Sequence, residues 1–157
     1  SYLKALSAKG WLQLIKVNGK TYKYELTASG DEERRRMLGQ YMAEIVQIYT
    51  TLKDSIRKKI LPLIESGITR VALFGASETG EIVLSVLQTT SMNVIAVVDN
   101  DEQKHGETFH HFIIAPPEIL KSISLQAVLI SSFARHHEIA QQIKHFTQDN
   151  NIQIITL

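Results

Sequence analysis

The sequence predicts an α/β protein built from a partial helix-and-hairpin unit, a long helix and a five-stranded doubly wound parallel sheet. Two strand-like runs flank Asn18-Gly19, and apolar residues then recur three or four positions apart as far as Gly67. Beyond that point, short apolar runs alternate with helical stretches, which is typical of a parallel sheet covered on both faces. We therefore divide the chain into residues 1–30, 31–66 and 67–157.

The first part begins with the end of a helix and continues as a hairpin. Gly10 follows an amphipathic stretch and suits the left-handed position that ends a helix. In the run WLQLIKVNGKTYKYELT, the pair Asn18-Gly19 favours a type I′ turn because both residues tolerate positive φ. We expect a two-stranded hairpin with one apolar and one wet face.

A long helix follows. Ser29 and Glu32 have the spacing of a capping box, so we expect the helix to begin there, and Pro62 is expected to kink or divide it near its end. A long helix with one apolar stripe must bury that stripe against its own domain or a second chain, and we favour a homodimer. The stripe comprises Met37, Tyr41, Ile45, Ile48, Leu52, Ile56, Ile60 and Ile64.

The third part alternates strands and helices. Right-handed crossovers between such strands predict the doubly wound order 3-2-1-4-5. The expected strands are residues 71–75, 94–99, 112–115, 127–132 and 152–157, and the expected helices lie near 79–89, 117–121 and 135–147.

Composition limits the chemistry and the location. The chain of 157 residues has no cysteine, which excludes disulfides, thiolate catalysis and Cys-ligated zinc. It has no apolar run of the roughly 18 residues that a membrane span needs, and no secretory signal, so we expect a soluble, cytoplasmic protein without a membrane partner.

Charge is distributed unevenly along the chain. Residues 1–30 hold five lysines against one glutamate, a net charge of +4, whereas residues 67–157 hold five basic and nine acidic residues, a net charge of −4. This asymmetry suggests that the first part meets a polyanion and that the last part has another task.

The turn GASETG, after the first strand of the third part, is the candidate ligand site. In a doubly wound sheet, ligands bind beyond the carboxyl ends of the strands, where free amides at a helix N-terminus suit an anion. Ser77 stands where a dinucleotide-binding turn has its middle glycine, so a nucleotide site and a purely structural turn both stay open. The candidate residues are Gly75, Ala76, Ser77, Glu78, Thr79 and Gly80, with Asp99 as acceptor for a ribose hydroxyl.

The segment SSFARHH leaves the fourth strand at the same edge. Ser131, Ser132, Arg135 and His136 could donate to a phosphate or sugar, or could simply cap the next helix. The sequence fits neither a nucleophile elbow nor a P-loop, and it holds no defined acid and base pair. We therefore expect no catalytic residue. We also expect no metal site, because adjacent histidines such as His110-His111 and His136-His137 chelate poorly.

Two stretches resemble known families. YLKALSAKGWLQLIKVNGKTYKYELTASG resembles the second half of a winged-helix DNA-binding domain of the MarR-like kind, lacking its earlier helices, so we expect a piece of a longer protein. RVALFGASETGEIVLSVL, VIAVVDND, PPEIL and AVLISSF resemble the small Rossmann domains of nucleotide-sugar and polysaccharide biosynthesis proteins, which are also fused to some winged-helix regulators. A similar domain order occurs in redox-sensing repressors.

The resemblance implies a ligand-responsive transcriptional regulator and no enzyme. Its partners would be double-stranded DNA, in the intact protein, and a small nucleotide-like ligand. The cofactor is unknown, with NAD(H), a nucleotide-sugar and coenzyme A as candidates. The alternatives are an enzyme or enzyme subunit acting on a nucleotide-sugar, and a Rossmann-like interaction module that binds nothing small. The implied DNA contacts are Tyr2 and Lys4 at the end of a major-groove helix, and Lys16, Lys20 and Lys23 on the wing.

Overall fold

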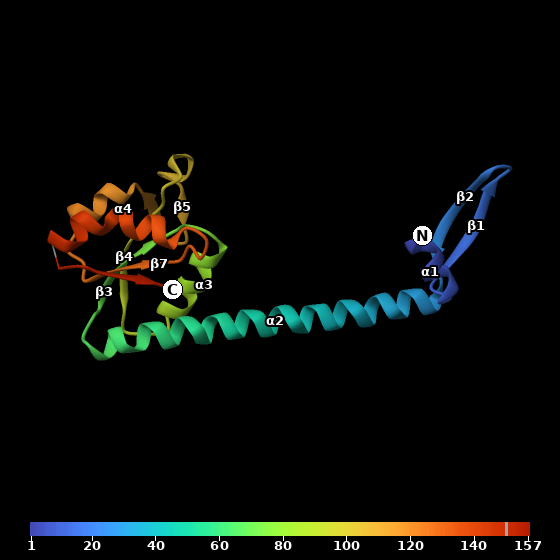
Figure 1. The fold of residues 1–157 in the computed structure, drawn as a ribbon, viewed down its shortest axis with the longest axis horizontal. Helices are drawn as coiled ribbons and strands as arrows, with labels where there is room; N and C mark the ends of the chain where they lie inside the picture. The colour runs from blue at the N-terminus through green and yellow to red at the C-terminus, as the bar shows by residue number, and fades with distance from the viewer. Residues whose placement is uncertain (150) are drawn as a thin grey trace. The chain divides into compact units, whose positions relative to one another are not determined.

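The structure is a computed structural model that describes residues 1–149 and 151–157. The chain divides into two compact units, residues 1–50 and residues 51–157 (Figure 1). The division falls inside one unbroken helix, α2 (Ala28–Glu65), which contributes its first part to unit 1 and its last part to unit 2. Among the described residues, no helix has both the length and the apolar character needed to span a bilayer.

Unit 1 begins with the short helix α1 (Tyr2–Ala8) and the hairpin strands β1 (Leu12–Asn18) and β2 (Thr21–Leu26). The helix ends as the sequence predicts: Gly10 has a φ of 74°, its amide donates to the Ser7 carbonyl over 2.9 Å, and the Trp11 amide donates to Leu6 over 3.1 Å. These two bonds form a Schellman motif, so the chain turns sharply from α1 into β1.

The predicted hairpin is confirmed, but its predicted type I′ turn is wrong. Asn18 pairs with Thr21, so Gly19 and Lys20 form the turn, and neither Asn18 nor Gly19 has a positive φ. The reason is a register shift between Lys16 and Asn18. A bulge of this kind moves the turn by one residue and removes the need for left-handed backbone.

The predicted capping box at the start of α2 is also wrong. The helix begins at Ala28, and the Thr27 hydroxyl accepts from the Gly30 amide over 3.0 Å, so Thr27 is the N-cap. The Ser29 hydroxyl instead donates to the Gly10 carbonyl over 3.0 Å, a tertiary contact that the local pattern does not reveal. At the other end, α2 continues through Pro62 to Glu65 without dividing.

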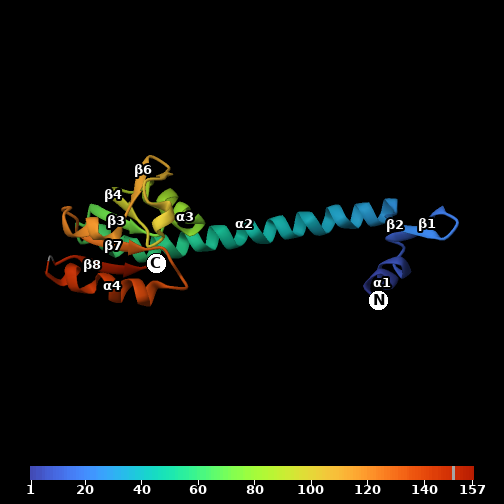
Figure 2. The same ribbon diagram turned by 90° about the horizontal axis from the view of Figure 1, so that it is seen from above.

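Unit 2 is built on a six-stranded sheet in the order β5-β6-β4-β3-β7-β8. The five parallel strands follow the predicted order 3-2-1-4-5 (Figure 2). The sixth strand was not predicted: it is a two-residue strand that pairs antiparallel with the edge strand β6, through a turn in which His110 has a φ of 55°. The strands are β3 (Arg70–Phe74), β4 (Asn93–Val98), β5 (Thr108–Phe109), β6 (Phe112–Ala115), β7 (Ala127–Ile130) and β8 (Gln153–Thr156).

Helices cover both faces of this sheet (Figure 1). On one face, α3 (Glu78–Leu87) and the last part of α2 enclose an apolar core with the strand side chains Val71, Leu73 and Val97. On the other face, α4 (His136–Asp149) packs with the strand side chains Phe74 and Ile130. The segment η2 (Pro117–Lys121) lies on this second face and is a 3₁₀ helix, at the place where the sequence suggested a helix.

Candidate functional site

The candidate site lies in unit 2, where β3 ends and α3 begins. Gly75 has a φ of 115°, and its amide donates to the Val98 carbonyl over 2.8 Å. A Cβ at Gly75 would lie 2.5 Å from the Ser131 hydroxyl. Both the backbone angle and the contact require glycine, so this residue fixes the tight turn.

Ser77 and Gly80 set the start of α3. Ser77 is its N-cap, and its hydroxyl accepts from the Gly80 amide over 3.4 Å. A Cβ at Gly80 would collide with the Gly75 carbonyl, so the close packing of α3 against the end of β3 requires glycine at this position. Glu78 is exposed and Thr79 half-buried at the same helix end, where the first backbone amides of a helix have no intrahelical acceptor and favour an anion.

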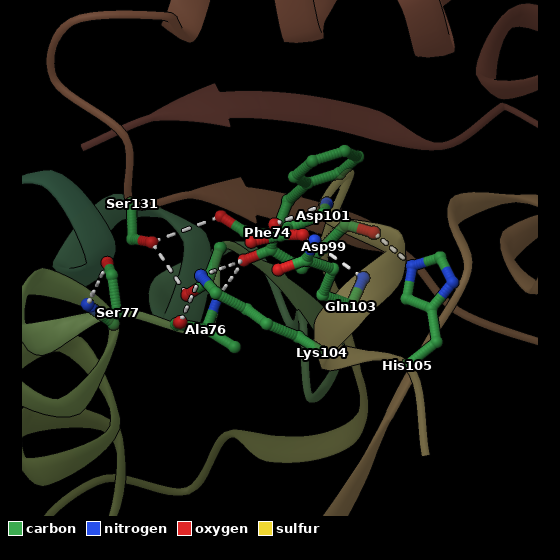
Figure 3. Close-up of polar contacts among 11 residues, drawn as sticks. Phe74, Ala76, Ser77, Asp99, Asp101, Gln103, Lys104, His105 and Ser131 are labelled. Carbon is green, nitrogen blue, oxygen red and sulfur yellow. Dashed lines mark hydrogen bonds and ion pairs between the residues drawn. The ribbon is translucent and has the colours of Figure 1, made fainter. Parts of the chain in front are cut away.

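Asp99 directly follows β4, and its side chain lies beside Ala76 (Figure 3). One carboxylate oxygen accepts from the Ala76 amide over 2.8 Å and lies 3.3 Å from the Lys104 ammonium; the other accepts from the Asp101 amide over 2.9 Å. Lys104 also donates to the Ala76 carbonyl over 3.0 Å. We call these four residues, Ala76, Asp99, Asp101 and Lys104, the Asp99 clasp. It uses the carboxylate that the sequence assigned to a ribose hydroxyl.

The clasp keeps Asp99 ionised. Burial, which leaves its side chain 15% exposed, raises the pKa of Asp99 and is the largest single influence. The amides of Asp101 and Ala76 and the charge of Lys104 oppose it, and together they hold the pKa below its ordinary value. The carboxylate is therefore a permanent acceptor at neutral pH.

The loop after Asp99 is ordered by its own contacts. Asp101 caps the 3₁₀ helix η1 (Glu102–Lys104) by accepting from the Gln103 amide over 3.1 Å, and a ring nitrogen of His105 lies 2.8 Å from the Asp99 carbonyl oxygen. Asp101 and Lys104 of this loop therefore belong to the candidate site, whereas Glu102 between them is exposed.

Ser131 belongs to the turn but is turned inward. It is fully buried, and its hydroxyl lies 3.1 Å from the carbonyl oxygens of both Phe74 and Gly75 (Figure 3). A hydroxyl has one proton to donate, so these two acceptors occupy it. Ser131 therefore ties β7 to the end of β3 in this conformation.

Where α4 begins, the side chains of Ser132, Arg135 and His136 contact residues close to them in the sequence. The Ser132 hydroxyl accepts from the Arg135 amide over 3.3 Å, and the exposed Arg135 side chain pairs with Glu138 over 3.2 Å. A ring nitrogen of His136 lies 2.8 Å from the Phe133 carbonyl oxygen. These contacts match the capping role that the sequence allowed, and the arrangement does not converge on the GASETG turn.

A further polar contact was not foreseen. The side-chain amides of Asn100 and Gln142 bond reciprocally, over 2.8 and 2.9 Å. The pair ties the loop after β4 to α4, the helix that follows β7, and β4 and β7 are the two neighbours of β3 in the sheet. The elements that flank the carboxyl end of β3 are thus linked by side chains.

The candidate DNA contacts lie in unit 1. Cross-strand pairing joins Lys16 with Tyr22 and Ile15 with Lys23, so Lys16 and Lys23 project from opposite faces of the hairpin, and Lys20 lies in its turn. Lys23 also pairs with Glu25 over 3.1 Å. Tyr2, Lys4, Lys16, Lys20 and Lys23 are all exposed.

The two histidine pairs lie at different places in unit 2, as the topology predicts. His110-His111 forms the turn that leads into β6, whereas His136-His137 begins α4 after β7, where the two rings lie 4.0 Å apart. The two histidine pairs therefore lie in separate parts of unit 2.

Comparison with solved structures gives remote likenesses. A UDP-D-quinovosamine 4-dehydrogenase from Vibrio fischeri is 20% identical with a TM-score of 0.48, over 57% of this chain and 78% of that one. RSP, a Rex-family repressor, is 10% identical with a TM-score of 0.47, over 99% and 80% of the two chains. RSP in complex with β-NADH is 7% identical with a TM-score of 0.44, over 57% and 53%. At these values the likenesses assign no function.

Sequence comparison is more decisive for the family. No curated protein matches the chain significantly. Residues 67–155, which include the whole parallel sheet except its last residues, match the family described as C2185-like, N-terminal. The matched segment is more than half of the 157 residues, and the chain belongs to the C2185-like, N-terminal family.

Proposed function

We propose that this chain is a ligand-responsive DNA-binding transcriptional regulator, in which unit 1 contacts DNA and unit 2 binds a nucleotide or nucleotide-sugar. The observation that carries the proposal is the pairing of two dissimilar units in one chain. Unit 1 is a basic helix and hairpin, and unit 2 is a parallel sheet with a glycine turn at its carboxyl edge. No step of this proposal needs a catalytic residue.

The DNA-binding part rests on the charge and shape of the hairpin. Lys16 and Lys23 lie on opposite faces and Lys20 lies at the tip. A hairpin with cations on both faces suits a groove of duplex DNA, because the groove has phosphates on both sides. The exposed Lys4 on α1 adds to the same positive region of the sequence.

The test is duplex DNA binding by the 157-residue chain as a function of salt, followed by fluorescence anisotropy. Each lysine that neutralises a phosphate steepens the salt dependence by about 0.9 in log-log slope. The variant Lys16→Gln with Lys20→Gln should lower the slope by about 2. A control with the same charge loss, Lys58→Gln with Lys144→Gln, should leave it unchanged. Absence of duplex binding at low salt contradicts this part of the proposal.

The ligand-binding part rests on the start of α3. Ser77 caps the helix, and the amides that follow it are oriented for an anion such as a phosphate. Asp99 is engaged in its clasp, so the proposal assigns the phosphate to the turn and leaves the sugar without a partner at Asp99 in this conformation. A ligand at Asp99 would share this carboxylate with the Ala76 and Asp101 amides and with Lys104.

A second candidate function is supported by the same clasp. Ser131 and Asp99 both satisfy groups of their own chain, and Asn100 and Gln142 join the elements on either side of β3. A turn whose polar groups are internally satisfied also suits a Rossmann-like module that binds a protein partner and nothing small. The two candidates differ in whether any nucleotide stabilises unit 2.

A further inference from the structure

Unit 1 and unit 2 differ sharply in whether they bury apolar side chains. Residues 1–50, all of which the structure describes, contain no buried apolar side chain, whereas unit 2 has a core on each face of its sheet. A unit of this size that buries no apolar side chain cannot offset the conformational entropy of ordering its backbone. Unit 1 therefore requires an apolar contact beyond those within it.

Much of the exposed apolar surface of unit 1 lies on α2. Eight apolar side chains within 13 successive residues are 41–68% exposed. At about 100° per residue they cover roughly half of the helix circumference. They are Met37, Leu38, Tyr41, Met42, Ile45, Val46, Ile48 and Tyr49, and we call this surface the α2 face.

The α2 face has the spacing of a helix-to-helix contact. Leu38, Met42, Ile45 and Tyr49 follow one another at intervals of four, three and four residues, which is the heptad pattern of a coiled-coil seam. The face also borders a cavity of about 490 Å³ within unit 1, lined in part by Met37, Leu38, Tyr41 and Trp11. The exposed apolar surface thus extends beyond the seam.

Charge limits what can cover this face. Between Met37 and Leu52 the only charged residue is Glu44. Nucleic acids and anionic membranes are bound through lysine and arginine, which this stretch does not contain. Two copies of an uncharged apolar face, in contrast, meet without repulsion between like charges.

We propose that the α2 face binds the α2 face of a second copy of this chain, so that the chain is a homodimer. Eight side chains that each leave roughly 80–100 Å² accessible supply about 700 Å² per copy, close to the ~800 Å² per partner of a standard interface. The inference rests on burial and charge in unit 1 alone. It holds whether or not the chain binds DNA or a nucleotide.

Sedimentation equilibrium of the 157-residue chain tests the proposal. The wild-type chain should sediment as a dimer, and Ile45→Glu should weaken dimerisation by roughly 100-fold or more, because each copy would bury an unpaired carboxylate. Gln47→Glu is the matched control: it adds the same charge about 200° around the helix and should remain dimeric. Neither substitution lies in unit 2, so the unfolding temperature of unit 2 should be the same in both variants as in the wild-type chain.

Cysteine cross-linking gives an independent readout, because the natural chain has no cysteine. Ile45→Cys should form a disulfide-linked dimer under mild oxidation far faster than Gln47→Cys. A monomeric wild-type chain overturns the proposal, and so does a dimer that Ile45→Glu leaves intact. The proposal is also overturned if the chain is monomeric and the thiol of the Ile45→Cys variant becomes protected from oxidation only when phosphatidylcholine vesicles are added. That result would assign the α2 face to a lipid surface.

Discussion

Asp99 joins three segments of unit 2 through one carboxylate. It accepts from the Ala76 amide at the end of β3 and from the Asp101 amide in its own loop, and it pairs with Lys104. The sequence shows an acid at the end of the second parallel strand, which is where a ribose acceptor is expected. It could not show the clasp, since the position of Lys104 depends on η1 and its cap at Asp101.

The clasp predicts a pH dependence of stability. Asp99 has a pKa below its unfolded value, so its contribution is present above the unfolded pKa and is lost as pH falls through the folded pKa. Asp99→Asn should lower the free energy of unfolding by about 1–3 kcal/mol at pH 7 and flatten its decline below about pH 4. Urea titrations at several pH values measure both effects. Glu102→Gln, at an exposed acid of the same loop, is the control, and an equal loss there would argue against the clasp.

A side chain at position 80 should destabilise unit 2 through a steric clash. A Cβ there meets the Gly75 carbonyl, so Gly80→Ala should destabilise unit 2 by about 1–3 kcal/mol or more although alanine favours helix. Ser85→Ala, in the same helix, removes a local bond to the Ile82 carbonyl and should stay within about 0.5 kcal/mol of wild type. Urea unfolding of the two variants compares them; a neutral Gly80→Ala would mean that α3 packs less closely on β3.

At the scale of elements, periodicity predicted which segments exist and tertiary contacts decided how they end. The stripe on α2 and the fully apolar strands are patterns spread over many residues, and they identified the long helix and the sheet. The strand-like runs on either side of Asn18-Gly19 identified the hairpin. Single contacts decided the details. Ser29 bonds to Gly10 and leaves the cap to Thr27, and a bulge after Lys16 moves the hairpin turn.

Alanine substitutions at different positions of α2 should lower the stability of unit 2 by different amounts. Ile56 is 1% exposed in the core of unit 2, so Ile56→Ala should lower the stability of that unit by about 2–5 kcal/mol. Leu61 lies in the same part of α2 but is 53% exposed, and Leu61→Ala should cost much less. Chemical denaturation followed by circular dichroism compares the two; equal costs would contradict the assignment of Ile56 to the core.

At the scale of the whole molecule, the strand order followed from chain topology because right-handed crossovers leave few alternatives. The state of the ligand crevice could not follow from topology. Whether Ser131, Asp99 and Gln142 face a ligand or their own chain depends on side-chain geometry, and each of the three bonds within the chain. The sequence identified the residues of the turn but not the partners that occupy them.

The proposed regulator predicts reciprocal coupling between its two units. A ligand that changes duplex affinity, typically 5- to 150-fold in coupled systems, must have its own affinity changed by DNA to the same extent. Anisotropy titrations of duplex with and without ligand, and calorimetric titrations of ligand with and without duplex, measure the two factors. The absence of any change in either titration would mean that the units act independently.

The proposed function requires the turn at the start of α3 to hold a phosphate-bearing ligand, and a thermal-unfolding series detects such a ligand. NAD, NADH, NADP, coenzyme A and several nucleotide-sugars are added to wild type, Ser77→Asn and Ser77→Asp; both substitutions keep an N-cap, but only the second adds a negative charge. A ligand at about 100 times its Kd stabilises by about 2.7 kcal/mol and should raise Tm by roughly 5–10 °C. We expect at least one compound to raise the Tm of wild type and of Ser77→Asn but not the Tm of Ser77→Asp. No rise with any compound, or a rise that survives Ser77→Asp, rules out this ligand site.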